Sequence, residues 1–455
     1  MRLLFLDQLA PEPGTLLEWA VSTTAPPRPD RTPPTSNQAI HLSADAPTTW
    51  LAATFDVAGP IDEAALQAAF EAWLPRHDAL HCGFSATAAS PAVDLYGDND
   101  FELTPRPPQR VESTDDLREV LGGRLDAACV PFTFPPYFLG AISRAERSTV
   151  VCGFDHAVCD GWSITVAVTE LDELYRAAHE EGPAGVARVA GGLPEAGSFL
   201  SYSVREAAAP TVAIGPSLRA WQDFLRAAGG DVPHFPIDLG VPAGALAPPG
   251  GDVRELLGAG AMTVLHRSAR AKGFSVFAVL LSAVAHAAAK LDGRDHIDLI
   301  FPVHTRRQPR NHNTFGWLVA NAPARIPVAA DLVTTVPGAD AAIRTGHRLA
   351  QVPAARVLAE MEGELRPRRR GVFSVSYTDY RYLPGGSRGA LGTVLPRNST
   401  HISRATPVDD VQLWFARTDD GLALRTRFPD TPIGRGVIEE FLGVLSDLVQ
   451  SATSH

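Results

Sequence analysis

The sequence predicts an α/β protein built from two domains. Apolar segments rich in β-branched residues, which are typical of strands, alternate along the chain with segments whose apolar residues recur at helical spacing. The chain has 455 residues, which is long for one domain and comfortable for two. Its 45% hydrophobic and 20% charged residues are enough to bury sizeable cores. We place the domain boundary in the Ala- and Pro-rich residues 207–216.

Composition excludes several classes of function. A formal net charge of −11 argues against a nucleic-acid-binding protein. No segment approaches 18 uninterrupted apolar residues and the apolar start is too short for a signal peptide, so we expect a cytoplasmic protein without membrane contact. The four cysteines form no CxxC pair and the 14 histidines form no ligand cluster, so no metal site is expected.

The first half should contain three strands and three helices. Acidic residues in the first turn mark one helix, Ser113 or Thr114 caps the next, and a helical apolar stripe beginning at Trp162 marks the third. In chain order we expect a strand at 48–57, a helix at 61–74, a helix at 114–125, a strand hairpin of 137–143 with 148–154, and a helix after Asp160. An irregular stretch should follow from residue 180 to 197.

The second half shows the same alternation. Ser275 is placed to cap an almost wholly apolar helix, which must be buried, and Asp419-Asp420-Gly421 predicts a hairpin turn. In order we expect a helix at 217–228, a strand at 262–266, the capped helix ending at 289, a strand at 297–303, a hairpin of 411–416 with 422–428, and a helix at 437–450.

The residues most suggestive of chemistry lie between strand 148–154 and the helix after it. His156 follows the strand, and Asp160-Gly161 opens the helix. Such a turn can present a reactive side chain above a rigid sheet. A lone histidine in this position is more often simply packed, and Asp160 alone could be a helix cap.

A family resemblance favours the catalytic interpretation. His156-x-x-x-Asp160-Gly161 resembles the HHxxxDG motif of the condensation-domain superfamily, with Asp155 in place of the first histidine, which is regarded as structural. Residues 76–84 resemble the second motif, RHExLRxxF. A third match, to the fifth motif, consists of Phe315, Gly316, Trp317 and Asn321.

The resemblance implies a fold and roles for the motif residues. It implies two chloramphenicol-acetyltransferase-like lobes, residues 1–206 and 217–455, in a V with a tunnel that contains His156. It also implies that His156 acts as general base and that Gly161 offers a backbone N–H to an oxyanion. Asp160 would hold the loop by pairing with Arg306 or Arg307. We expect the acceptor to attack the thioester directly, without an acyl-enzyme, because no Ser or Cys nucleophile with a neighbouring base is evident and Cys159 is expected to be a small buried residue.

The implied function is that of a stand-alone condensation-type acyltransferase in actinobacterial natural-product or lipid biosynthesis. The donor would be a phosphopantetheine thioester, on an acyl or peptidyl carrier protein or on coenzyme A, and the acceptor an alcohol or amine. No bound cofactor is expected, and the protein is expected to be a monomer. The alternatives are an inactive module that recruits partner enzymes, which typically lacks the motif histidine, and an epimerase.

One further group of residues could contact the donor. Arg366, Arg368, Arg369 and Arg370 form a basic run in an acidic protein. Such runs are usually solvated loops, but this one could also dock an acidic carrier protein or the phosphates of coenzyme A.

Overall fold

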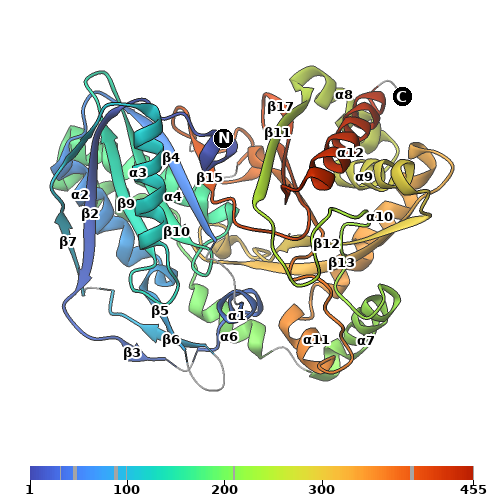
Figure 1. Ribbon diagram of the computed structural model, residues 1–455. Helices are drawn as coiled ribbons and strands as arrows, with labels where there is room; N and C mark the ends of the chain where they lie inside the picture. The colour runs from blue at the N-terminus through green and yellow to red at the C-terminus, as the bar shows by residue number, and fades with distance from the viewer. Residues whose placement is uncertain are drawn as a thin grey trace. The chain divides into compact units, whose positions relative to one another are not determined.

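We describe a computed structural model of the protein, covering residues 1–30, 32–44, 49–86, 91–98, 100–208, 211–389 and 394–453 (Figure 1). It confirms the α/β fold class and divides the chain into two units. Unit 1 comprises Met1–Ala208, Thr305–Leu318 and Arg381–Arg404; unit 2 comprises Ala209–His304, Val319–Tyr380 and Ala405–His455. The units thus differ from the expected lobes, 1–206 and 217–455, because two segments of the second half pack with the first.

Unit 1 is built on an eight-stranded sheet in the order β1-β15-β4-β10-β9-β2-β7, with β8 also paired to β2. The strands are β1 (Arg2–Phe5), β15 (Thr400–Ser403), β4 (Trp50–Ala58), β10 (Arg147–Asp155), β9 (Tyr137–Ser143), β2 (Gly14–Thr23), β7 (Phe101–Pro105) and β8 (Gln109–Val111). A small second sheet pairs β3 (Arg28–Pro29), β6 (Ala92–Leu95) and β5 (Cys82–Ser85). The predicted hairpin is therefore present as β9 and β10.

Alternate residues of the central strands supply two cores, one on each face of the sheet. Val150, Cys152 and Phe154 of β10 point into one core, whereas Val151 between them belongs to the other. This is the period of two expected for a strand that is buried on both faces. Helices α2 (Glu63–Trp73) and α4 (Gly161–Glu181) pack on the first face, and α3 (Thr114–Ala128) covers the second (Figure 1).

The remaining helices of unit 1 are α1 (Ser36–Ser43), α5 (Pro183–Gly192) and α6 (Phe199–Ala207). Helix α5 corrects the prediction of an irregular stretch at 180–197. Gly182 ends α4 with a φ of 67°, Pro183 starts α5, and Val186 is buried against the core of unit 1. Gly-Pro at this point separates two helices instead of starting a loop.

Unit 2 has a six-stranded sheet in the order β11-β17-β16-β14-β12-β13. Its strands are β11 (Pro249–Gly258), β17 (Gly421–Pro429), β16 (Gln412–Arg417), β14 (Ser374–Asp379), β12 (His296–His304) and β13 (Val319–Pro327). The predicted hairpin of 411–416 with 422–428 is thus confirmed as β16 and β17.

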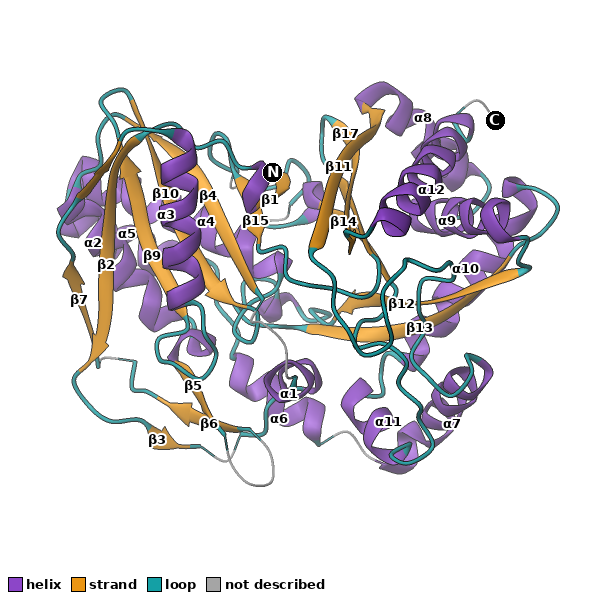
Figure 2. Cartoon of the chain, in the orientation of Figure 1, coloured by secondary structure: helices purple, strands orange, loops and turns teal. Residues whose placement is uncertain are grey.

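Helices α8 (Ala259–Ala271), α9 (Val276–Asp292), α10 (Leu332–Leu349) and α12 (Pro432–Ser451) pack around this sheet, and α7 (Thr211–Ala227) and α11 (Ala354–Glu360) form a smaller cluster (Figure 2). Ser275 caps α9 as predicted, accepting a hydrogen bond from the Ala278 N–H. The strand expected at 262–266 is wrong. Met262, Leu265 and Ala269 form the buried face of α8, at helical spacing. Helix α7 also begins before the predicted residue 217, within the expected boundary segment.

No single helix in the described part of the chain is long and apolar enough to cross a membrane. Helices α8 and α9, which are bent by 101° relative to each other, have the necessary length and apolar composition only as a pair.

Candidate active site

The loop between β10 and α4 holds His156 in unit 1. Strand β10 ends at Asp155, and the His156 N–H donates to the Thr49 carbonyl at 2.9 Å. Asp160 has extended backbone angles and accepts a hydrogen bond from the Ser163 N–H at 2.8 Å, so it is the N-cap of α4. Both residues lie where the sequence predicted them, His156 directly after the strand and Asp160 at the start of the helix.

The hydrogen bond of the His156 ring defines its tautomer. Nδ1 lies 2.8 Å from the Cys159 carbonyl oxygen, which can only accept, so Nδ1 carries the hydrogen. Nε2 therefore has a free lone pair in the neutral ring. Burial, together with the charge of nearby His41, lowers the pKa of His156 below its ordinary value. The ring is consequently neutral at physiological pH, which is the form that can accept a proton.

Trp317 forms one wall beside this histidine. Its ring stacks on the His156 ring at a centroid distance of 3.9 Å and an interplanar angle of 26°. Trp317 lies in Thr305–Leu318, the segment that unit 1 receives from the second half of the chain. The motif thus supplies a flat apolar surface that fixes the orientation of the imidazole.

Asp160 pairs with Arg306, one of the two arginines that the sequence offered. The Arg306 guanidinium makes two contacts with the carboxylate, of 2.5 Å and 3.0 Å, and the side chain of Arg306 is fully buried. Arg307 next to it is exposed. Burial opposes ionisation of Asp160, but the charge of Arg306 and hydrogen bonds from Arg306 and Ser163 hold the pKa of Asp160 below its ordinary value. Asp160 is therefore an ionised carboxylate, and both of its oxygens are engaged by protein groups.

Gly316 completes the same network through its backbone. The Ser163 hydroxyl contacts the Gly316 carbonyl at 2.9 Å and its N–H at 3.0 Å, and Arg306 donates to the same carbonyl at 3.2 Å. The φ of Gly316 is 144°, and a Cβ there would lie 2.3 Å from the Phe199 ring. Only glycine fits this position. Phe315, its neighbour, is fully buried against Trp73 and Phe154.

Gly161 and Asn321, the other two predicted site residues, differ in their surroundings. The Gly161 N–H lies in the first turn of α4 and so has no acceptor within the helix. A Cβ added to Gly161 would meet only His401, at 3.6 Å, an ordinary contact. Asn321 lies on β13 in unit 2, opposite Pro302 of β12.

The second motif anchors α4 through a carboxylate that the sequence analysis did not single out. Glu170, on α4, is buried and bonded to His77 Nε2 at 2.7 Å, Arg76 Nε at 3.1 Å and Trp73 Nε1 at 3.1 Å. Asp78 accepts the Phe199 N–H at the start of α6. These residues position the helix that carries the Asp160 cap.

His41 is a further residue that sequence reasoning missed. Its Nε2 lies 3.0 Å from Oδ1 of Asp155, the residue in place of the motif's first histidine. Its ring centroid is 6.4 Å from that of His156 and 5.8 Å from that of Trp317. Gln38, one turn earlier on α1, donates to the Ala157 carbonyl at 2.7 Å. Asp155 itself could have indicated such a residue, because a carboxylate at the end of a buried strand requires a partner.

Cys159 does not have the properties of a nucleophile. Its side chain is fully buried, and burial together with the charge of Asp160 raises the pKa of the thiol well above its ordinary value. The thiolate, which is the reactive form, is therefore strongly disfavoured. Among the described residues no group of three or more potential ligands could hold a metal ion.

The basic run lies in unit 2 beside a cluster of buried carboxylates. The Arg368 N–H donates to Asp231 and the Arg370 N–H to Asp409. Arg369 approaches Asp410 at 3.8 Å, whereas Arg366 bonds to nearby backbone carbonyls. The run is thus anchored through its backbone, and 65% of the Arg368 side chain is exposed.

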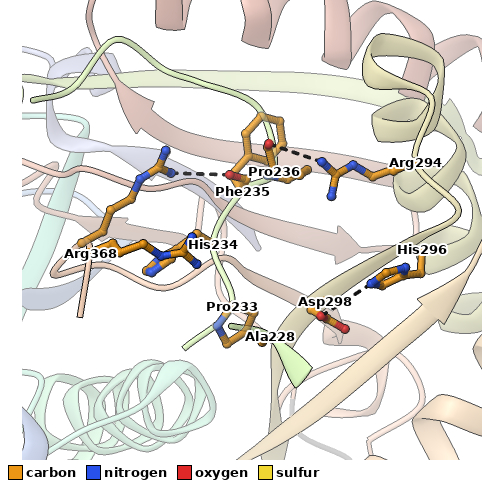
Figure 3. A pocket seen from close by; sticks show the side chains of 10 residues that line it. Ala228, Pro233, His234, Phe235, Pro236, Arg294, His296, Asp298 and Arg368 are labelled. Carbon is orange, nitrogen blue, oxygen red and sulfur yellow. Dashed lines mark hydrogen bonds and ion pairs between the residues drawn. The ribbon is translucent and has the colours of Figure 1, made fainter. Parts of the chain in front are cut away.

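A pocket of about 320 Å³ opens next to this run (Figure 3). Arg368, Arg369, Arg294, His234 and His296 contribute to its lining. Arg294 donates to the Pro236 carbonyl, and the His234 ring bonds to Asp231 at 2.9 Å and to Asp410 at 2.7 Å. The lining therefore combines arginine side chains with the carboxylate of Asp298, and further carboxylates lie behind it.

The fold and the His156 loop define a class of protein. Residues 35–375 match the family model of the condensation domain, which is about three quarters of the chain, so the chain belongs to the condensation domain family. Proteins of this family transfer acyl groups, and the protein is an acyltransferase.

Comparison with individual proteins points to mycobacterial acyltransferases. Trehalose-2-sulfate acyltransferase PapA2 of Mycobacterium tuberculosis is 25% identical over 480 residues, covering 97% of this chain and 95% of that one. Acyltransferase PapA3 of the same species is 24% identical over 469 residues, with coverages of 98% and 95%. A solved structure of a PapA2 acyl transferase superimposes over the whole of both chains with a TM-score of 0.86 at 22% identity.

Proposed function

We propose that the protein transfers an acyl group from a phosphopantetheine thioester to the hydroxyl group of a small polar acceptor, forming an ester. The support for a hydroxyl acceptor is the similarity to PapA2, whose name specifies a sulfated trehalose, a sugar derivative with hydroxyl groups and no amine. An amine acceptor, giving an amide, is the competing substrate class. Actinobacterial lipid or natural-product biosynthesis, in the cytoplasm and as a monomer, is the corresponding setting.

One observation carries the mechanism: the Nδ1 of His156 is bonded to the Cys159 carbonyl, so the lone pair of Nε2 is available. Nε2 takes the proton from the acceptor hydroxyl while the oxygen attacks the thioester carbonyl. The C–O bond forms and the C–S bond breaks, and the departing thiolate takes the proton from His156. The N–H groups at the start of α4, at Gly161, stabilise the oxyanion.

Attack is direct in this mechanism, because the one cysteine in the motif is held as a thiol. Cys159 would have to ionise in a buried site that disfavours its thiolate. No resident cofactor is needed, since the donor brings its own activated carbonyl. An acyl carrier protein or coenzyme A is the donor's carrier.

We further propose that the donor's acidic carrier or phosphate groups dock at the basic run of unit 2. The exposed guanidinium of Arg368 and the arginine-containing pocket beside it support this assignment. The carboxylate of Asp231 behind Arg368 also binds the Arg368 N–H and His234, and 65% of the Arg368 side chain remains exposed.

The proposal is tested by incubating the protein with acyl-coenzyme A or an acyl-carrier protein, then adding trehalose or an amine. Mass spectrometry follows both the small-molecule product and the intact protein. We expect an acylated hydroxyl product, no mass increase on the protein with donor alone, and product formation slowed by about 10²–10⁴-fold in His156→Ala. Stoichiometric acylation of the protein would overturn direct attack, and product formation by folded His156→Ala at the wild-type rate would overturn the role of His156.

A further inference from the structure

Asp155 places a buried negative charge immediately before the proposed base. Its side chain is fully buried, and its Oδ1 accepts hydrogen bonds from the Ala157 N–H at 2.8 Å and from His41. Its Oδ2 has no hydrogen-bond partner among the described residues. A carboxylate in this position favours the protonated form of a neighbouring imidazole. The charge of Asp155 therefore acts against the burial that keeps His156 in the form that can accept a proton.

His41 is the side chain of α1 that meets this carboxylate. It approaches Asp155 at 3.0 Å and keeps only 15% of its side chain exposed. Helix α1, which carries it, is fixed at its start by a Thr35–Gln38 capping box and to the His156 loop by the Gln38–Ala157 hydrogen bond. The His41 ring also meets the edge of Trp317, the residue that stacks on His156.

We propose that His41 is a positioning residue for acyl transfer: paired with Asp155, it cancels the carboxylate's charge beside His156 and so keeps His156 able to accept a proton. The inference rests on the proposed function of His156 as base. It also accounts for a departure from the motif, because it gives the buried carboxylate of Asp155 a partner on α1.

The other charged groups around His156 do not supply this compensation. Asp160 and Arg306 neutralise each other in their direct pair. His401, on β15, faces the start of α4. Burial is the first cause of the lowered pKa of His156 and the charge of His41 is the second, whereas Asp155 acts in the opposite direction. The contact between His41 and Asp155 and the lowered pKa of His156 therefore support the same role for His41.

The test follows the His156 ring directly, without any substrate. Protein labelled with ¹³C at histidine Cε1 is titrated by NMR, and His156→Ala assigns the His156 signal. In His41→Gln we expect the His156 midpoint to rise by roughly 0.5–2 pH units, from Coulomb's law over about 6.4 Å at effective dielectric constants of ~20–80. The His41→Gln, Asp155→Asn double variant should return the midpoint close to that of the wild type. The acidic limb of the kcat/KM profile should move with the NMR midpoint.

Gln38→Ala is the matched control, because it loosens the same helix from the same loop without changing charge. A midpoint that rises equally in Gln38→Ala and His41→Gln, or that stays unchanged in His41→Gln while the signals show a folded protein, would overturn the inference. Activity at the wild-type rate in folded His156→Ala would instead remove the proposed role of His156, and the NMR midpoints would still report on His41 and Asp155 separately.

Discussion

Replacing Asp160 by alanine should destabilise unit 1 as well as abolish turnover. The substitution leaves the Arg306 guanidinium buried without its counter-charge, and it removes the N-cap of α4. Breaking a buried ion pair by removing one partner costs roughly 3–5 kcal/mol. With an unfolding entropy of about 2.1 cal/mol/K per residue over the roughly 250 residues of unit 1, this lowers the Tm by about 6–10 °C, or about half that if the whole chain unfolds together.

Differential scanning calorimetry of Asp160→Ala and four further variants separates the loss of charge from the loss of the cap. Asp160→Asn keeps an oxygen for the Ser163 N–H and removes only the charge, so its Tm should fall less than that of Asp160→Ala. Arg306→Met should resemble Asp160→Ala, and the Asp160→Leu, Arg306→Met double variant should be more stable than Asp160→Ala, because no charge is left buried alone. The exposed Arg307→Ala is the matched control and should melt like the wild type. If Asp160→Ala melts within 1 °C of the wild type and only turnover falls, the carboxylate takes part in the chemistry and the structural assignment is wrong.

Four further outcomes are expected. His156→Ala should reduce kcat by about 10²–10⁴-fold with an unchanged Tm, because a general base contributes that much; calorimetry and the rate assay together check this. Arg368→Glu should raise the KM for the donor and weaken the salt dependence of that KM, while the KM for the acceptor stays constant. Unchanged donor kinetics would mean that the basic run is a solvated surface loop with no part in docking. Gly316→Ala should fail to reach the wild-type Tm, since its Cβ would overlap Phe199. Burial opposes protonation of His234, but hydrogen bonds to Asp410 and Asp231 raise its pKa above the ordinary value. Protonated His234 therefore stabilises the folded protein fully below about pH 6.5, and this stabilisation is lost as the pH rises through the folded-state pKa. The Tm difference between the wild type and His234→Gln should be larger at pH 6 than at pH 9.

The sequence was most informative where local pattern and chemistry coincide. A β-branched run followed by His156 and an Asp-Gly pair predicted the strand, the turn and the cap, because each depends on neighbours within a few residues. The choice between Arg306 and Arg307 could not be made from sequence. Adjacent side chains on a loop point to different sides, and the partner of Asp160 is separated from it by 146 residues.

The features that the sequence analysis missed have two causes. One is a contact between residues far apart in the chain, and the other is a segment that fits both a strand pattern and a helix pattern. His41 meets Asp155 across 114 residues, which no periodicity reveals. Residues 262–266 include β-branched Thr263 and Val264, yet the buried positions follow the 3.6-residue repeat of α8, and packing against the core decided the outcome.

Residues 305–318 belong to unit 1 but are translated long after the rest of the His156 site, and this affects how the chain folds during translation. Ribosomes add about 5–20 residues per second, so the 146 residues between Asp160 and Arg306 take roughly 7–30 s to synthesise. During that interval the nascent first half has neither the cation for Asp160 nor the strand β15, which lies between β1 and β4. Until Arg306 emerges, the carboxylate is better hydrated than buried. The start of α4 should therefore close over its core only after Arg306 has been synthesised.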